Sequence, residues 1–356
     1  MMSRQKLPFY EEISHLYLIL INQKWWCFKL RPVSNFQCAF TVVMATITLF
    51  LYVIYGTPKC DMQEFKKGKH LDPEAYEVAY PYQYNFLLDQ PEKCQHKPFL
   101  VIIVPVAPND IMERQSIRTT WGNEKLVREN HVVILFLMGL PSGENAEIQQ
   151  VRINQENVRH GDLLQSDFID SGKNITIKTM VMLEWLRDRC PQAYYAAKVD
   201  TDILFNVRSV ISMLLSPLTP QKNYITGQVQ SSDSTIRNPS SRFYIPAEVY
   251  PKSVIPPYPL GKCYIMSMDM PAKILKASME IKPIIKDDVY IGLCLERLRI
   301  APVNPPNPSQ FVFTPPRLYD RCYYSELIAV IIYTPAQLVN LWTDIHKPGA
   351  ACSPFN

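Results

Sequence analysis

The chain has 356 residues, of which 47% are hydrophobic, so it can bury a sizeable core and disorder is not the default. The net charge of +4 is mild, and no basic stripe is interleaved with aromatic residues, which argues against nucleic acid as a partner. Neither G-x-x-x-x-G-K-S/T nor G-x-G-x-x-G occurs, which excludes the two commonest nucleotide-binding loops.

The first predicted element is a membrane-spanning helix at residues 36–55. This stretch has no charged residue, and a helix of that length crosses the ~30 Å hydrocarbon layer of a bilayer. A buried core helix is the alternative, but so long an uncharged run favours the membrane. Residues 1–35 precede it, which is too much chain for an ordinary cleaved signal peptide. We therefore expect a transmembrane signal anchor behind a cytoplasmic tail.

The residues after the span have features typical of an oxidising lumenal compartment. Charge does not orient the span, because basic residues flank both of its ends. Seven cysteines follow it without C-x-x-C zinc spacing, so at least one thiol stays free or pairs between chains. Asn174-Ile175-Thr176 is the only N-glycosylation sequon. We interpret residues 56–95 as a lumenal stem and residues 96–356 as a lumenal domain glycosylated at Asn174.

Strands and helices alternate along the lumenal domain. The predicted strands cover residues 98–104, 132–138, 193–199 and 264–267, and the predicted helices cover residues 110–120, 144–160, 174–189 and 287–299. A loop rich in Ser, Asn and Pro separates the last two strands at about residues 229–242. This alternation predicts an α/β fold with a mixed, mainly parallel sheet and flanking helices.

The triplet Asp200-Thr201-Asp202 directly follows the predicted strand at 193–199. Two carboxylates two residues apart at a strand end can hold one hard divalent cation, with diphosphate oxygens completing its coordination. Taken alone, the triplet favours an ordinary turn in which Asp hydrogen-bonds its own backbone. The motifs around it shift the balance towards a metal site.

Arg114 and Arg118 lie four residues apart, on one face of the helix that follows the first strand. The carboxyl ends of strands in open α/β sheets bind ligands, so the two arginines suit a pyrophosphate or nucleotide there. The alternative is a solvated helix face, where charged residues are often four apart. The spacing alone, without the other motifs, favours this alternative.

Five ordered stretches resemble glycosyltransferase family 31, the β-1,3-glycosyltransferases. They are Arg-x-x-Ile-Arg-x-Thr-Trp-Gly at 114–122, Phe-Leu-Met-Gly at 136–139, the run at 161–179, Lys-Val-Asp-Thr-Asp at 198–202 and Asp-Asp-Val-Tyr-Ile-Gly at 287–292. The resemblance covers roughly residues 95–345 and identifies 96–356 as a catalytic domain. It implies a GT-A-type nucleotide-sugar transferase fold in a type II membrane protein of the Golgi.

The activity implied by the resemblance is that of a metal-dependent, inverting β-1,3-hexosyltransferase. Its donor would be UDP-galactose, UDP-N-acetylglucosamine or UDP-N-acetylgalactosamine, and its acceptor a glycan on a glycoprotein or glycolipid. By the same resemblance, Asp200 and Asp202 would hold Mn²⁺ or Mg²⁺ against the diphosphate, with Thr201 between them in the donor site.

The resemblance also assigns roles outside the triplet. Arg114, Arg118 and Lys178 would lie in the nucleotide-binding region, although Lys178 is equally consistent with a snorkelling helix residue. Asp288 would be the general base that takes the proton from the acceptor's 3-hydroxyl. Asp287 and Asp288 also stand where Asp caps a helix, so we expect Asp287 to cap and Asp288 to catalyse.

Several residues depart from the family pattern near the expected site. The family usually reads Tyr-x-Ser-Gly-x-Gly-Tyr where this chain has residues 258–264, so Leu260 and Cys263 replace a serine and a glycine. The loss of the glycine would fill space near a bound sugar. Ile331 stands where the family often has a histidine, and His160 replaces a tyrosine. Cys263 could pair with Cys294. The alternative to an enzyme is therefore a catalytically impaired relative, acting as a membrane-tethered glycan- or partner-binding protein.

Overall fold

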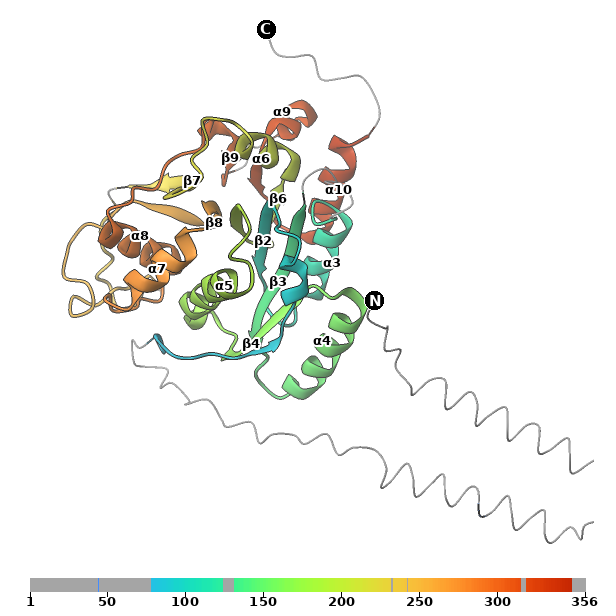
Figure 1. Cartoon of the computed structure of the whole chain (residues 1–356), viewed down its shortest axis with the longest axis horizontal. Helices are drawn as coiled ribbons and strands as arrows, with labels where there is room; N and C mark the ends of the chain where they lie inside the picture. The colour runs from blue at the N-terminus through green and yellow to red at the C-terminus, as the bar shows by residue number, and fades with distance from the viewer. Residues whose placement is uncertain are drawn as a thin grey trace, which may run out of the picture. The chain divides into compact units, whose positions relative to one another are not determined.

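The computed structural model describes Met44 and residues 78–123, 131–231, 233–241, 243–314 and 318–347 (Figure 1). The predicted tail, the span at 36–55 apart from Met44, and most of the stem lie outside these residues. Within the described ranges, no helix is both long and apolar enough to cross a membrane. The predicted span therefore stays a prediction.

A seven-stranded mixed sheet has the strand order β1-β4-β3-β2-β5-β8-β7. Its strands are β1 (Phe86–Leu88), β2 (Leu100–Pro105), β3 (Val132–Leu140), β4 (Leu163–Ile169), β5 (Tyr195–Val199), β7 (Ile225–Gln230) and β8 (Tyr258–Ser267). The central strands β4, β3, β2 and β5 are parallel, whereas β1, β8 and β7 pair antiparallel with their neighbours. The mixed sheet is confirmed, and its parallel part is confined to the centre.

Strand β8 begins six residues before the predicted start, at Tyr258 rather than Tyr264. Pro259 and Gly261 disfavour a strand in the sequence, because proline cannot donate to a ladder and glycine has no side chain to pack. Pairing with β7 overrides this preference, since Tyr258 lies opposite Gln230 and Pro259 opposite Val229. The extension places Gly261 and Lys262 beside the end of β5.

A three-stranded sheet, β6-β10-β9, follows the acidic triplet. Its strands are β6 (Ile203–Phe205), β9 (Phe311–Val312) and β10 (Ala329–Ile331). Ile331 of β10 pairs with Ile203 of β6, and the amide of Ile332 donates to the carbonyl of Asp202 at 2.8 Å. The C-terminal part of the described chain thus anchors the backbone of the triplet.

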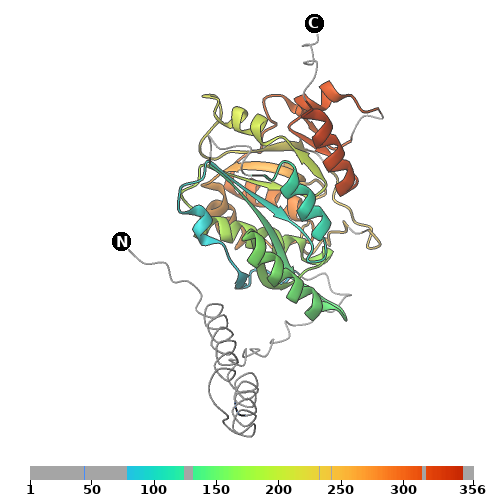
Figure 2. The same ribbon diagram turned by 90° about the vertical axis from the view of Figure 1, so that its right-hand side faces the viewer.

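Helices cover both faces of the large sheet (Figures 1 and 2). They are α3 (Ile111–Thr119), α4 (Ala146–His160), α5 (Ile175–Arg189), α6 (Val207–Leu214), α7 (Met270–Ser278), α8 (Asp287–Leu298), α9 (Arg321–Glu326) and α10 (Pro335–Ile345), with short 3-10 helices η1 (Pro91–Cys94), η3 (Gly172–Asn174) and η4 (Pro308–Gln310). Successive side chains of a strand point to opposite faces. Val101 of β2 accordingly packs in the core beneath α5, α7 and α8, while Ile102 packs in the core beneath α3, α4 and α10.

The cysteines follow this two-sided arrangement. Cys94 and Cys190 form a disulfide, and Cys322 is also disulfide-bonded. Cys263 and Cys294 are buried free thiols, so the predicted pairing between them is wrong. The physical reason is that Cys263 lies in the core on the α3 side of the sheet, and Cys294 of α8 lies in the core on the other side.

Candidate active site

The predicted acids meet at the carboxyl end of β5. Asp200 and Asp202 lie in the turn between β5 and β6, whereas Asp287 and Asp288 are the first residues of α8. Lys198 and Gly261 connect the two groups. The Lys198 ammonium contacts Asp200 and lies 3.8 Å from Asp287, and the backbone of Gly261 contacts both Asp288 and Lys198. The structure therefore brings together acids that are almost ninety residues apart in the sequence.

The buried ammonium group of Lys198 is the centre of this cluster. It donates to Asp200 Oδ1 at 2.8 Å and to the carbonyl of Gly261, and it lies 3.8 Å from Asp287 Oδ2. Burial alone would lower the pKa of Lys198, yet the carboxylates of Asp200 and Asp287 raise it above its ordinary value. Lys198 is therefore a permanent cation that holds the turn against α8, a role that the sequence analysis did not assign.

The Asp288 carboxylate is nearly buried and oriented by backbone amides. Its Oδ2 accepts from the amide of Gly261 at 3.2 Å, and its Oδ1 accepts from the amide of Val289 at 2.8 Å. The ammonium of Lys286 lies 3.8 Å from Oδ1. A Cβ added at Gly261 would lie 3.3 Å from the Cβ of Asp288, so this position keeps close contact with the carboxylate.

Asp287 does not cap α8, contrary to the prediction. The N-cap residue is Lys286, and Asp287 Oδ2 instead accepts from Thr179 Oγ1 of α5 at 2.7 Å. Burial raises the pKa of Asp287 despite the nearby Lys198 ammonium. A buried cation and hydroxyl offer this carboxylate better partners than its own helix does, so Asp287 ties α8 to α5.

The Asp200–Asp202 pair fits a divalent cation. Within the described residues, Asp202 Oδ1 is buried and has no hydrogen-bond partner, as expected of an oxygen kept for a ligand. No group of three His, Cys, Asp or Glu side chains there could hold a metal by itself. The protein thus supplies two carboxylates, and diphosphate and water oxygens would complete the shell, which is how Mg²⁺-type ions usually bind.

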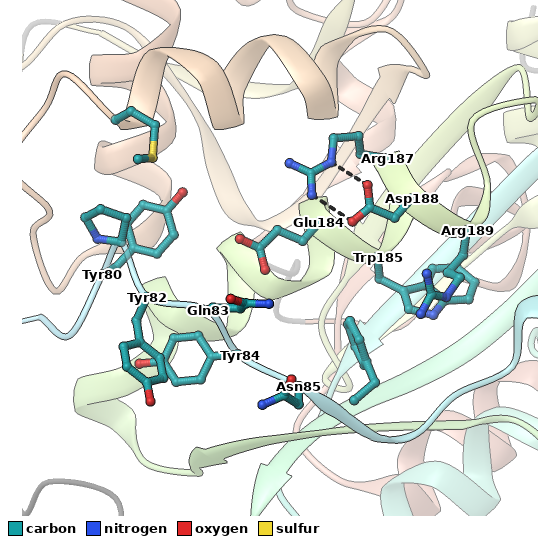
Figure 3. Close-up of a pocket in the computed structure, with 13 residues that line it drawn as sticks. Tyr80, Tyr82, Gln83, Tyr84, Asn85, Glu184, Trp185, Arg187, Asp188 and Arg189 are labelled. Carbon is teal, nitrogen blue, oxygen red and sulfur yellow. Dashed lines mark hydrogen bonds and ion pairs between the residues drawn. The ribbon is translucent and has the colours of Figure 1, made fainter.

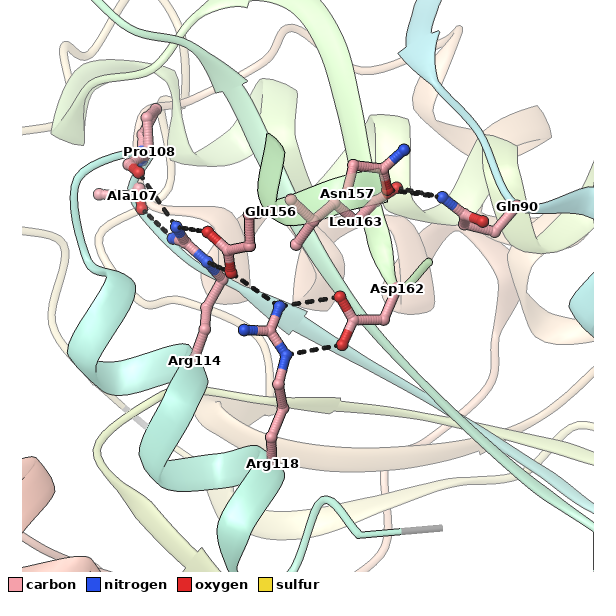
Figure 4. A network of polar contacts seen from close by, with 9 residues as sticks. All are labelled: Gln90, Ala107, Pro108, Arg114, Arg118, Glu156, Asn157, Asp162 and Leu163. Carbon is pink, nitrogen blue, oxygen red and sulfur yellow. Dashed lines mark hydrogen bonds and ion pairs between the residues drawn. The ribbon is translucent and has the colours of Figure 1, made fainter. Parts of the chain in front are cut away.

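Arg114 and Arg118 form a network of ion pairs with Glu156 and Asp162 (Figure 4). Arg114 is fully buried, and its guanidinium contacts both Glu156 oxygens and the carbonyls of Ala107 and Pro108. Arg118 forms a two-point ion pair with Asp162 and also contacts Glu156 at 2.7 Å. These contacts make the arginines supports of the loop after β2, and their predicted contact with a nucleotide stays a prediction.

Lys178 of α5 is buried and does not snorkel. Its ammonium donates to the carbonyl of Val106 at 3.0 Å and pairs with Asp170, whose Oδ2 also accepts from the amide of Gly139. One lysine thus joins the ends of β2, β3 and β4. Like Arg114, it holds the backbone beside the site in place.

Thr201 and Asn174 occupy the remaining predicted positions. Thr201 is partly exposed between the two aspartates. The side-chain amide of Asn174 donates to the carbonyl of Ile169 at 2.8 Å, and the sequon's Thr176 is buried and bonded to the carbonyls of Ile284 and Ile285. The sequon therefore stabilises the start of α5, and its glycosylation stays a prediction.

The four departures from the family pattern lie in different parts of the fold. Cys263 is fully buried in the core on the α3 side, and the expectation that it fills space near a bound sugar stays a prediction. Leu260 and Ile331 are partly buried and pack against the cores. His160 is exposed at the end of α4.

A separate cavity of about 640 Å³ lies at the other end of α5 (Figure 3). Its lining includes Tyr80, Tyr84, Glu184 and Arg187, and it contains none of the predicted site residues. The candidate active site is therefore identified by the acid cluster and not by this cavity.

A family model described as galactosyltransferase matches residues 112–306. The chain is 37% identical to beta-1,3-galactosyltransferase 2 of Pongo abelii over 275 residues. The aligned region covers 76% of this chain and 64% of that protein. It is 34% identical to beta-1,3-galactosyltransferase 1 of Mus musculus over 268 residues, in an alignment that covers 74% of this chain and 79% of that protein.

Solved structures give looser matches. The galactosyltransferase LgtC, in complex with donor and acceptor sugar analogues, overlaps 70% of this chain and 97% of its own at a TM-score of 0.36 and 13% identity. A mannosyltransferase of Pyrobaculum calidifontis, in complex with GDP-Man and Mn²⁺, overlaps 68% of this chain and 64% of its own at a TM-score of 0.33 and 14% identity.

Proposed function

The chain belongs to the galactosyltransferase family, and we propose that it is a metal-dependent, inverting β-1,3-hexosyltransferase with a GT-A-type fold. Its donor would be a UDP-sugar, and UDP-galactose is the first to test because the named relatives are galactosyltransferases. The observation that carries the proposal is that Lys198 and Gly261 join the Asp200 turn to Asp288.

The aspartate pair is the proposed donor site. Asp200 and Asp202 would hold Mn²⁺ or Mg²⁺, which when bound neutralises charge on the departing diphosphate. Lys198 keeps Asp200 oriented towards that position, because its ammonium is fixed between the turn and Gly261. Arg114, Arg118 and Lys178 hold the neighbouring strand ends, where we place the nucleotide.

Asp288 is the proposed general base. A carboxylate within hydrogen-bonding reach of the acceptor's 3-hydroxyl can take its proton as that oxygen attacks the sugar. Its Oδ2 accepts only one described hydrogen bond, at 3.2 Å from Gly261, which leaves a lone pair for the acceptor's 3-hydroxyl. Attack from the face opposite the diphosphate would convert an α-linked donor to a β product.

The proposed setting is the Golgi membrane. Residues 36–55 would anchor a type II protein whose catalytic domain, with a glycan on Asn174, faces the lumen. The disulfide between Cys94 and Cys190 supports an oxidising compartment. The acceptor would then be a glycan on a glycoprotein or glycolipid passing through that compartment.

The direct test is transfer by the full-length chain with Mn²⁺, UDP-sugars and β-linked glycan acceptors. We expect a β-1,3-linked product, abolished by EDTA and by Asp202→Ala. Asp288→Asn should lower kcat by about 10²- to 10⁴-fold with UDP binding retained, because general-base catalysis contributes that much. Asp188→Asn, an exposed acid paired with Arg187, should leave transfer unchanged. UDP binding without transfer to any acceptor would instead indicate the non-catalytic, glycan-binding alternative.

A further inference from the structure

We propose that the ammonium group of Lys262 is a built-in counter-ion of the Asp200–Asp202 pair, which a divalent cation must displace in order to bind. The inference rests on the proposed function, since it concerns the same acid pair. It assigns Lys262 the role of weakening metal binding until the donor is present. The position is variable in the family motif quoted above, so the resemblance assigns Lys262 no role.

The backbone holds Lys262 directly beside the acids. Its carbonyl accepts from the amide of Asp200 at 2.9 Å, and the next residue, Cys263, pairs with Val199 of β5. Its ammonium lies 2.6 Å from Asp202 Oδ2 and 3.6 Å from Asp200 Oδ2. One ammonium therefore bridges both predicted metal ligands.

The bridging contact uses the oxygens that a metal would need. Asp200 Oδ1 is already bonded to Lys198, and Lys262 takes Asp200 Oδ2 and Asp202 Oδ2. Of the four carboxylate oxygens, only Asp202 Oδ1 has no partner within the described residues. A hard cation binds carboxylate oxygens at about 2.0–2.6 Å, so it and the ammonium cannot contact the same oxygens together.

The two lysines beside the pair differ in their freedom to move. The side chain of Lys198 is 2% exposed, whereas that of Lys262 is 40% exposed. Lys198 therefore stays in place, and Lys262 can swing out when a cation arrives. Each acid of the pair therefore already contacts an ammonium group, and an incoming cation must compete with those contacts.

The displaced ammonium would have a new partner only when donor is bound. A lysine is a compact point charge that binds phosphate well, and the diphosphate would lie against the same cation. Metal and donor should therefore bind with positive coupling, because the donor compensates Lys262 for the carboxylates that it loses. Metal alone should bind weakly.

The test measures binding of Mn²⁺ alone to the full-length chain, by the electron paramagnetic resonance signal of free Mn²⁺. Lys262→Met removes the charge and keeps an unbranched side chain, and we expect it to bind Mn²⁺ about tenfold more tightly, or about 1.4 kcal/mol. Lys262→Arg keeps the charge and should bind as weakly as the wild type. Lys252→Met removes an exposed lysine that pairs with Glu296, and it controls for net charge.

The inference is overturned if Lys262→Met and the wild type bind Mn²⁺ equally, or if Lys252→Met gives the same gain. Lys262→Gln serves as a second neutral variant if the methionine variant fails to fold. Adding UDP should tighten Mn²⁺ binding more in the wild type than in Lys262→Met, and equal tightening would also count against the inference. Transfer activity with equal Mn²⁺ affinities would refute this inference alone, whereas no Mn²⁺ binding to any variant with UDP present would refute the proposed metal site as well.

Discussion

Glu156→Gln tests whether the buried ion pairs of Arg114 and Arg118 hold the domain together. The substitution keeps the size of the side chain and removes the charge between Arg114 and Arg118. Arg114 would lose its only carboxylate partner within the described residues. Because its side chain is fully buried, its positive charge would then have neither a counter-ion nor water around it. Arg118 would keep Asp162.

The size of the effect follows from this asymmetry. Removing one partner of a buried ion pair costs about 3–5 kcal/mol, because the other charge stays buried. The carbonyls of Ala107 and Pro108 still accept from Arg114, so we expect the lower end, about 3 kcal/mol. For a domain of this size, that loss lowers the melting temperature by roughly 9 °C.

The measurement is thermal unfolding of the two full-length proteins by circular dichroism, with Glu296→Gln as the matched control. Glu296 pairs with Lys252 at the surface, where such pairs contribute about 0–1 kcal/mol, so its loss should shift the melting temperature little. UDP affinity should also fall in Glu156→Gln, because the loop after β2 loses its support. A melting temperature within 2 °C of the wild type would show that the network is not structural, and the reasoning would be refuted.

The ion pairs of Glu156 with Arg114 and Arg118 also make the stability of the protein depend on pH, in a direction that follows from the pKa of Glu156. Burial alone would raise the pKa of Glu156, but Arg114 and Arg118 hold it below its ordinary value of 4.5. A lowered pKa adds stability above the unfolded value and loses it as the pH falls through the folded value. The difference in unfolding free energy between wild type and Glu156→Gln should therefore be constant from pH 6 to 8 and shrink below about pH 4.5.

Two further predictions concern the site and the disulfide. Gly261→Val should lower kcat by about 10²-fold with UDP binding retained, because the added side chain presses on Asp288. The control is Gly172→Ala, where an added Cβ meets nothing within 4 Å and transfer should be unchanged. A fully active Gly261→Val enzyme would contradict the close contact between Gly261 and Asp288. Replacing Cys94 and Cys190 by serine should lower the unfolding free energy by about 3–4 kcal/mol, because the disulfide closes a separation of 96 residues; an unchanged urea midpoint would contradict this.

The sequence predicts the elements whose pattern is local. The helices at 110–120, 174–189 and 287–299 are found within one residue at each end as α3, α5 and α8, because apolar periodicity and punctuating residues define them. The antiparallel edges of the sheet could not be predicted in this way. Pairing between β8 and β5 depends on a return after about sixty residues, which leaves no local signal.

The site divides in the same manner. Asp200, Asp202 and Asp288 were identified from motifs, and the structure brings them together. The cations that organise them were missed, because a lysine in a strand reads as an ordinary polar residue until its neighbours across the sheet are known. Lys198 lies near Asp287 only because β5 pairs with β8, which in turn packs against α8.

The position of Lys262 changes how the departures from the family pattern are read. Cys263 and Ile331 looked damaging in the sequence, yet one lies in the core and the other in a strand beside it. The residue that touches both metal ligands stands at a position that the motif leaves open. A motif records what relatives require, whereas a variable position next to it can set how strongly the required groups act. In this chain, the control of metal binding therefore depends on one flexible ammonium, and replacing it should alter Mn²⁺ affinity without altering the acids themselves.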